Sequence, residues 1–322
     1  MNFWQELKKP IICLAPMDEV TDVVFREVVA DIARPDVFFT EFTNVDALNS
    51  KGRETQIRRL EYTENQRPIV AQIWGLKPEN YFKIAKELQE MGFDGIDINM
   101  GCPDKSIRKS GSCSSLIENR NLALEVITAT KEGAGDLPVS VKTRLGVREI
   151  QTEDWIGFLL LQKLQAITIH GRTVKEMSKV PTHWDEIGRA VNLKNKIAPQ
   201  TIIIGNGGVK NYLEATQRVL EFGVDGVMIG TGIFQDIFAL SKAGDTEESH
   251  KVEEMLQLLL LHGQLFEETW GDTKKFLTLR KFFKIYIHGF EGASELRGKL
   301  MEVENLEQTK MIVEKYISRL SS

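Results

Sequence analysis

The side chains best suited to chemistry in this chain lie at or just beyond the ends of short apolar, β-branched segments. They are the thiol of Cys102, the amine of Lys142 and the imidazole of His170. A thiol can donate a proton, or act as a nucleophile when a nearby cation lowers its pKa. A lysine can form a Schiff base or place a positive charge beside a cofactor ring. These residue types indicate an enzyme whose reactive groups come from successive segments of one fold.

Two glycine-containing loops follow the last two of these apolar segments. They are Asn206-Gly207-Gly208 and Gly230-Thr231-Gly232. Glycine lets backbone N–H groups approach a phosphate closely, and eight-stranded barrels commonly bind a phosphate at the loops after strands seven and eight. Either loop alone could simply make a tight turn. Their occurrence at both positions favours a phosphate site.

The elements that must position these groups alternate regularly over the first three quarters of the chain. Apolar runs of strand length cover residues 10–17, 37–42, 68–74, 95–100, 137–143, 166–170, 201–205 and 226–229. Helical spacing of apolar side chains is seen between them, in residues 78–91, 116–131 and 211–222. Nearly continuous apolar strands are typical of a parallel sheet buried on both faces. The pattern predicts a (β/α)₈ TIM barrel with its site at the carboxyl ends of the strands. A doubly wound open sheet fits less well, because no glycine follows the first strand.

A polar stretch at residues 242–250 interrupts this alternation. Beyond it, residues 252–269, 274–287, 293–301 and 306–320 all have helical patterns. We therefore expect a barrel domain over residues 1–243 and an all-helical domain over residues 244–322.

Composition and charge exclude several classes of protein. The chain has 322 residues, a net charge of −5 and three cysteines. Sparse, odd-numbered cysteines without a signal sequence predict a reducing cytoplasm. Ligand spacing for a metal is absent, and no apolar run approaches the roughly 18 residues of a membrane span. No protein partner can be read from the sequence. We expect neither metal nor membrane as a partner.

Any contact with nucleic acid must use a local basic patch, because the chain as a whole is acidic. Residues 105–109 hold three lysines and arginines, and residues 272–288 hold five against one acid. A charge run is most often a solvated face. These two runs, however, belong to the predicted mouth of the barrel and to the helical domain. They suit a cleft that holds an RNA backbone while one base enters the barrel.

A set of short motifs occurs in a fixed order along residues 10–300. The motifs are Leu14-Ala-Pro-Met17, Pro68-Ile-Val-Ala-Gln72, Asp97-Ile-Asn-Met-Gly-Cys-Pro103, Val139-Ser-Val-Lys-Thr-Arg144, His170-Gly-Arg-Thr173, Gly205-Asn-Gly-Gly208, Asp225-Gly-Val-Met-Ile-Gly230 and Gly289-Phe-Glu-Gly-Ala293. In this order they resemble the tRNA-dihydrouridine synthases, a family of flavin enzymes. The motif around Cys102 is the most specific of them.

The resemblance implies a reaction and a set of site residues. FMN, reduced by NADPH, would pass a hydride to C6 of a uridine in tRNA, and Cys102 would protonate C5. FMN contacts would come from Pro16, Met17, Asp18, Gln72, Lys142, His170, Asn206, Gly207, Gly208, Gly230 and Thr231. Substrate contacts would come from Asn99, Lys105, Arg144 and Arg172.

The chain departs from the family pattern at three places. It has Asp18-Glu19 where the family often has Ala-Gly, Thr231 where it often has arginine, and Met177-Ser178-Lys179 where Gln and Tyr are common. Losing an arginine removes a bidentate phosphate donor. These departures keep open the alternative of a non-catalytic RNA-binding relative. An FMN-dependent barrel oxidoreductase acting on a small-molecule pyrimidine or enone is a second alternative, because it would share the glycine loops and Lys142 without needing the basic helical region.

Overall fold

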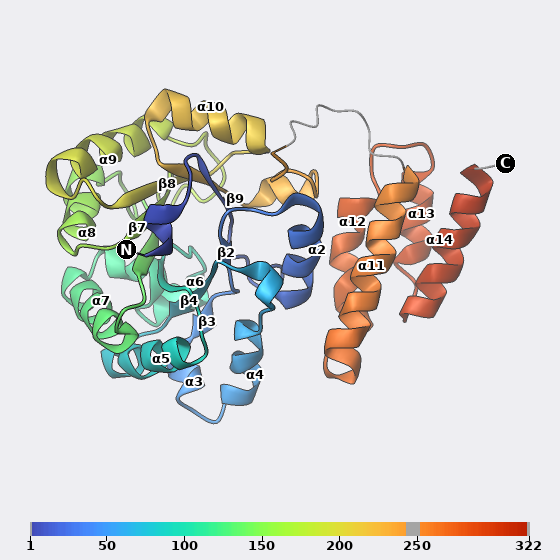
Figure 1. Ribbon diagram of the computed structural model, residues 1–322, viewed down its shortest axis with the longest axis horizontal. Coiled ribbons are helices and arrows are strands. Elements are labelled where there is room, and N and C mark those ends of the chain that lie inside the picture. The colour runs from blue at the N-terminus through green and yellow to red at the C-terminus, as the bar shows by residue number, and fades with distance from the viewer. Residues whose placement is uncertain (1, 243–251, 321–322) are drawn as a thin grey trace.

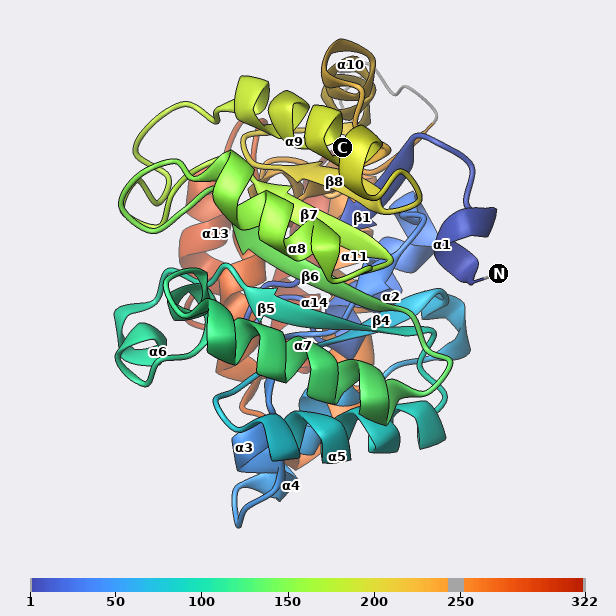
Figure 2. The ribbon, with the colours of Figure 1, turned by 90° about the vertical axis from the view of Figure 1, so that its left-hand side faces the viewer.

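The computed structural model describes residues 2–242 and 252–320, and its larger part is a parallel β-barrel surrounded by helices (Figures 1 and 2). The strands are β1 (Ile11–Leu14), β2 (Phe38–Phe39), β3 (Thr43–Asn44), β4 (Ile69–Trp74), β5 (Gly95–Met100), β6 (Val139–Arg144), β7 (Ala166–His170), β8 (Ile202–Asn206) and β9 (Gly226–Ile229). Their order around the sheet is β1-β9-β8-β7-β6-β5-β4-β2, and β3 also pairs with β4. A parallel bridge between Cys13 and Val37 brings β1 back beside β2. All eight predicted strands are present, and the TIM barrel is confirmed.

The helices of the barrel cover its outer face (Figure 2). The longer ones are α2 (Val23–Ala33), α5 (Pro78–Glu90), α7 (Arg120–Ala134), α9 (Trp184–Ile197) and α10 (Tyr212–Phe222). Short helices are α1 (Phe3–Glu6), α3 (Val45–Leu48), α4 (Arg53–Ile57), α6 (Lys105–Lys109) and α8 (Gly157–Leu161). The helix expected from residue 116 begins later, because the Asn119 side chain accepts a hydrogen bond from the Leu122 N–H and caps α7 there.

A buried carboxylate, Asp225, joins the two ends of the barrel sequence at its amino-terminal rim. Its side chain accepts hydrogen bonds from Lys9 Nζ at 2.5 Å, the Ile203 N–H at 2.8 Å and Lys194 Nζ at 3.3 Å. Its carbonyl oxygen accepts one from the Ile11 N–H at 3.1 Å. The first strand is thus fixed to residues near the last two strands.

The remaining described residues form a helical region that packs on α2 (Figure 1). It contains α11 (Val252–Trp270), α12 (Phe283–Tyr286), α13 (Ala293–Leu300) and α14 (Leu306–Leu320). Phe282 stacks on Phe25 of α2 with ring centroids 5.2 Å apart. The expected boundary at residues 243–244 lies outside the residues that the structure describes. Within 2–242 and 252–320, no helix is both long and apolar enough to cross a membrane.

One predicted helix in this region has a different form. Residues 274–287 were expected to be α-helical, but Phe276–Phe282 form 3₁₀ turns before the short α12. Phe276, Leu279 and Phe282 are three residues apart and all pack into the apolar core. A 3₁₀ helix has three residues per turn, so it places this spacing on one face.

Candidate active site

Strand register brings the predicted polar side chains together at the mouth of the barrel. Asn99 pairs in register with Lys142, and Arg144 and Asn206 each pair with His170. Because the strands are parallel, their carboxyl ends meet at one rim. Lys142 Nζ donates to Asn206 Oδ1 at 3.2 Å, and Asn206 Nδ2 donates to the Met228 carbonyl at 2.8 Å. Four strands, β5 to β8, therefore contribute to one site.

The electrostatics of this rim are set by burial among cations. Burial, followed by the charge of Arg144, lowers the pKa of Lys142 to about 8. Burial and the cations Arg144, Lys142 and Arg172 lower the pKa of His170 to about 2, so its imidazole is neutral at physiological pH. Arg172 Nη1 lies 3.1 Å from His170 Nε2. A guanidinium can only donate, so Nε2 accepts and the ring proton lies on Nδ1.

A buried polar network lies between β4, β5 and β6. Gln72 Nε2 donates to Asp97 Oδ2 at 2.7 Å, and Ser140 Oγ donates to Asp97 Oδ1 at 2.6 Å. Asn99 Nδ2 donates to Gln72 Oε1 at 3.0 Å. Burial raises the pKa of Asp97 to about 6, although both hydrogen bonds lower it. Asp97 was not among the site residues predicted from the sequence, although it lies two residues before Asn99 and hence on the same face of β5.

Cys102 differs from the other two cysteines in its exposure. It is half-buried, whereas Cys13 and Cys113 are fully buried. Its backbone N–H donates to Asn99 Oδ1 at 3.0 Å, and Ser114 Oγ donates to its carbonyl at 2.7 Å. Burial raises the pKa of the Cys102 thiol above its usual value. At neutral pH the thiol is protonated and can act as an acid.

The loop after β8 has a backbone conformation that requires glycine at two successive positions. Gly207 and Gly208 have φ values of +115° and +73°, which favour glycine. A Cβ on Gly207 would lie 2.9 Å from the His170 ring, and one on Gly208 would lie 2.9 Å from Thr182 Oγ1. Thr182 Oγ1 is buried and has no hydrogen-bond partner among the described residues. A ligand with acceptor oxygens, such as the FMN phosphate, fits an open donor beside two glycines.

Thr182 was not identified from the sequence, and Arg172 borders the glycine loop as well as His170. Arg172, which is predicted to contact the uracil, has its Nη2 3.9 Å from the position of a Cβ on Gly208. Its Nε donates to the Val180 carbonyl at 2.7 Å. Both side chains thus border the glycine loop, where they could contact a phosphate.

The other predicted site residues differ in their burial and in their contacts with the barrel mouth. Arg144 is buried and donates to the carbonyls of Gly101 and Thr173 at 2.8 and 3.2 Å, so it connects three strand ends. Half-buried Pro16 and Met17 follow β1, and Gly230 and Thr231 follow β9, the strand paired with β1. Asp18 and Lys105 are exposed, and Asp18 forms an ion pair with Arg59.

The dihydrouridine synthase (Dus) family model matches residues 13–321. The chain belongs to this family. A relative named "Probable tRNA-dihydrouridine synthase" in Staphylococcus aureus (strain MRSA252) is 45% identical over 99% of this chain and 97% of its own length. In Bacillus subtilis (strain 168), "Probable tRNA-dihydrouridine synthase 2" is 43% identical over 98% and 96% of the two chains.

A solved structure supports the fold alone. Histamine dehydrogenase from Rhizobium sp. 4-9 superposes with a TM-score of 0.57 at 13% identity, covering 82% of this chain and 51% of that one. Membership of the dihydrouridine synthase family confirms the resemblance found in the sequence. It also confirms that the chain is an oxidoreductase.

Proposed function

We propose that this dihydrouridine synthase reduces the C5–C6 double bond of uridine in tRNA, with FMN as cofactor and NADPH as reductant, in the cytoplasm. Family membership and the names of its relatives support this assignment. The observation that carries it is the half-buried Cys102, held by Asn99 beside Lys142 at the barrel mouth. That arrangement offers a proton donor and a cation to one ligand.

The residues present at the barrel mouth fit FMN. Gly207, Gly208, Thr182 and Arg172 would hold the phosphate, because they combine backbone donors, an unpaired hydroxyl and a guanidinium. Gly230 and Thr231, which follow β9, would add contacts to FMN. Gln72 and Lys142 would hold the ring, with Pro16 and Met17 against it. When bound, FMN supplies the hydride that reduces the substrate.

Cys102 supplies the proton. Its pKa is raised, so the thiol is protonated at neutral pH and donates to C5 of the uracil, after which the thiolate regains a proton from solvent. Asn99 fixes the backbone of Cys102 and donates a hydrogen bond to Gln72, which would contact the flavin. Hydride at C6 and proton at C5 complete the reduction of uridine to dihydrouridine.

Some cations of the two basic runs already have partners within the protein. Arg280 donates to the Val303 carbonyl at 2.6 Å and therefore holds the helical region together. Lys274 and Lys281 form ion pairs with the barrel, and Lys275, Lys284, Lys105 and Lys109 are exposed, so all six lysines are candidates for contact with the RNA backbone.

A direct assay tests this function. The purified protein is incubated with unmodified tRNA transcript and NADPH, and dihydrouridine is measured by mass spectrometry of the digested RNA. We expect yellow protein and dihydrouridine in the tRNA. NADPH oxidation with small enones or free pyrimidines, and no dihydrouridine in tRNA, would instead favour the small-molecule alternative. Colourless protein that binds tRNA without NADPH oxidation would favour the non-catalytic one.

A further inference from the structure

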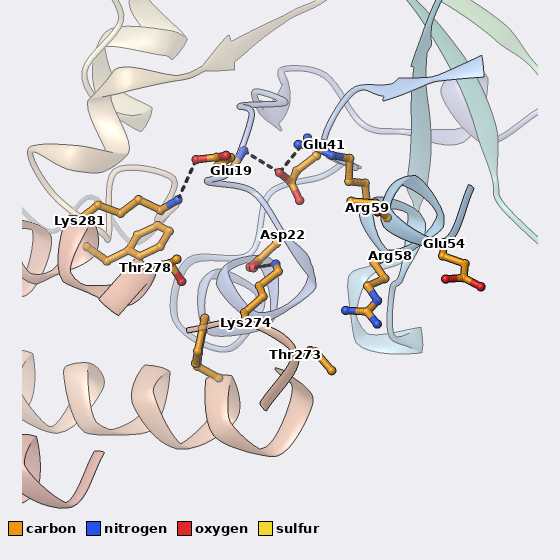
Figure 3. A pocket seen from close by; sticks show the side chains of 13 residues that line it. Glu19, Asp22, Glu41, Glu54, Arg58, Arg59, Thr273, Lys274, Thr278 and Lys281 are labelled. Atoms are coloured by element: carbon orange, nitrogen blue, oxygen red, sulfur yellow. Dashed lines mark hydrogen bonds and ion pairs between the residues drawn. The ribbon is translucent and has the colours of Figure 1, made fainter. Parts of the chain in front are cut away.

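A cleft separates the β1–α2 loop from the helical region (Figure 3). It has a volume of about 510 Å³ and is lined by residues of that loop, of α4 and the turn after it, and of residues 266–282. Its lining includes four positive side chains and four carboxylates. They are Arg58, Arg59, Lys274 and Lys281, and Glu19, Asp22, Glu41 and Glu54. A site for an RNA backbone should be positive, so these carboxylates need an explanation.

Two ion pairs cross this cleft, and they differ in character. Lys274 Nζ lies 2.9 Å from Asp22 Oδ2, and Asp22 also caps α2 by accepting a hydrogen bond from the Phe25 N–H at 3.0 Å. The Asp22 side chain is 12% exposed, so this pair is structural. Lys281 Nζ lies 3.8 Å from Glu19 Oε2, and the Glu19 side chain is 74% exposed. The second pair is long, solvated and easily exchanged.

The backbone at Glu19 is in the left-handed region, with φ +55°. Its N–H donates to the buried Glu41 at 2.6 Å, and Arg59 lies 3.3 Å from the same Glu41 oxygen (Figure 3). These contacts fix the loop and aim the Glu19 side chain across the cleft. The left-handed region is unfavourable for a residue with a Cβ, and an exposed ion pair of this length offsets little of that cost. Stability therefore does not explain the carboxylate at this position, and strain of this kind points to function.

We propose that Glu19 takes the place of an RNA phosphate against Lys281 in the free protein, and that tRNA binding exchanges this carboxylate for a backbone phosphate. The inference rests on the proposed function, because the RNA is its tRNA substrate. The cleft wall formed by Arg58, Arg59, Lys274 and Lys281 is then the surface that receives the backbone. A phosphate offers Lys281 more acceptor oxygens than one carboxylate does.

This exchange has two consequences for binding. The Glu19 carboxylate competes with RNA, so it lowers affinity for every polyanion that enters the cleft. It also neutralises Lys281 when no RNA is present. Only a ligand with further contacts, such as a tRNA that also places a base at the barrel mouth, offsets the loss of the Glu19–Lys281 pair. Glu19 thus keeps the cleft largely free of short or unstructured RNA, which lacks those further contacts, without changing the ratio of the affinities for the two ligands.

The experiment measures the dissociation constant for unmodified tRNA transcript, by fluorescence anisotropy over a series of salt concentrations, in a double-mutant cycle. Glu19→Gln should tighten binding about two- to fivefold, as expected for loss of one exposed competing pair. Lys281→Met should weaken binding. It should also make the plot of log affinity against log salt concentration less steep, by the amount expected for the loss of about one phosphate contact. In the Lys281→Met background, Glu19→Gln should have no effect, because the lysine through which it acts is absent.

Glu54→Gln is the matched control, because Glu54 lines the same cleft and its loss changes the net charge equally. Equal effects of Glu19→Gln and Glu54→Gln, or an effect of Glu19→Gln that persists without Lys281, would overturn the exchange. If Glu19→Gln is poorly folded, Glu19→Gly removes the carboxylate at a backbone position that glycine prefers, and should tighten binding equally. Wild-type protein that binds no tRNA would instead refute the proposed function itself.

Discussion

Asn99 Oδ1 accepts a hydrogen bond from the backbone N–H of Cys102 at 3.0 Å. The same amide donates through Nδ2 to Gln72 Oε1, also at 3.0 Å. One side chain therefore sets the spacing between the proposed proton donor and a residue proposed to contact FMN. A shift of about 1 Å in such a spacing can cost 10²-fold in rate.

Cys102→Ala should keep FMN and NADPH oxidation but lose dihydrouridine formation by about 10²-fold or more, which is the usual contribution of a general acid. The flavin half-reaction does not use the thiol, so only the reduction of uridine should suffer. Single-turnover formation of dihydrouridine by pre-reduced enzyme measures it. Cys113→Ala is the control and should be nearly silent, because Cys113 is fully buried. The reverse pattern would assign the acid to Cys113.

The lowered pKa of Lys142 predicts how the rate of flavin reduction depends on pH. Its pKa is lowered to about 8, so its positive charge is present below that pH and is lost as pH rises through it. We expect the rate of flavin reduction by NADPH, followed by stopped-flow absorbance, to fall across this range. Lys142→Met should be slower at low pH and lack the step, whereas Lys175→Met, at an exposed lysine, should behave as wild type. An unchanged profile in Lys142→Met would remove this lysine from the mechanism.

Thr182→Val tests the phosphate site without changing the size of the side chain. The Thr182 hydroxyl is buried and has no partner among the described residues, so it is available to the phosphate. A hydrogen bond to a charged group contributes about 1.5–3 kcal/mol, hence about tenfold or more in FMN affinity. Riboflavin, which lacks the phosphate, should bind both proteins equally in fluorescence titrations. Thr231→Val is the comparison variant in the other glycine loop. A larger loss of FMN affinity in Thr231→Val than in Thr182→Val would assign the phosphate to the loop after β9.

Phe282→Ala should weaken the attachment of the helical region to the barrel. Phe282 is 4% exposed and stacks on Phe25 of α2, so its truncation should cost about 3–5 kcal/mol in the free energy of unfolding. Urea denaturation measures the change. Phe290→Ala is a control within the helical region, since Phe290 is only half-buried and packs on Tyr316, and its cost should be smaller. Equal costs would mean that the Phe25 contact contributes little.

The barrel could be predicted from the sequence because strands buried on both faces are nearly continuous apolar runs, as in β4 and β8. The carboxyl ends of parallel strands meet at one rim of a barrel, so Lys142, His170 and Cys102 could be predicted to lie together there. The 3₁₀ turns at 276–282 were read as α-helix, because spacings of three and four residues are hard to distinguish over two turns.

The parts of the site that depend on tertiary contacts had no local signal. Thr182, which is proposed to contact the phosphate, lies beside Gly208 only because an irregular loop brings it there. Lys274 meets Asp22 across 252 residues of sequence, so a run that looked free to bind RNA is partly neutralised by the barrel. Asp97 could have been found, because a carboxylate within an apolar strand requires partners.

The attachment of Lys9 and Ile11 to Asp225 also has a meaning for biosynthesis. Lys9 and Asp225 are 216 residues apart, and a ribosome adding about 5–20 residues per second needs roughly 10–40 s to make that length. During this time β1 can meet β2, but its other edge has no β9 to pair with. The first strand to leave the ribosome, β1, is therefore among the last to gain both of its neighbours. The nascent chain has one unpaired apolar strand edge until β9, the last strand of the barrel, is synthesised.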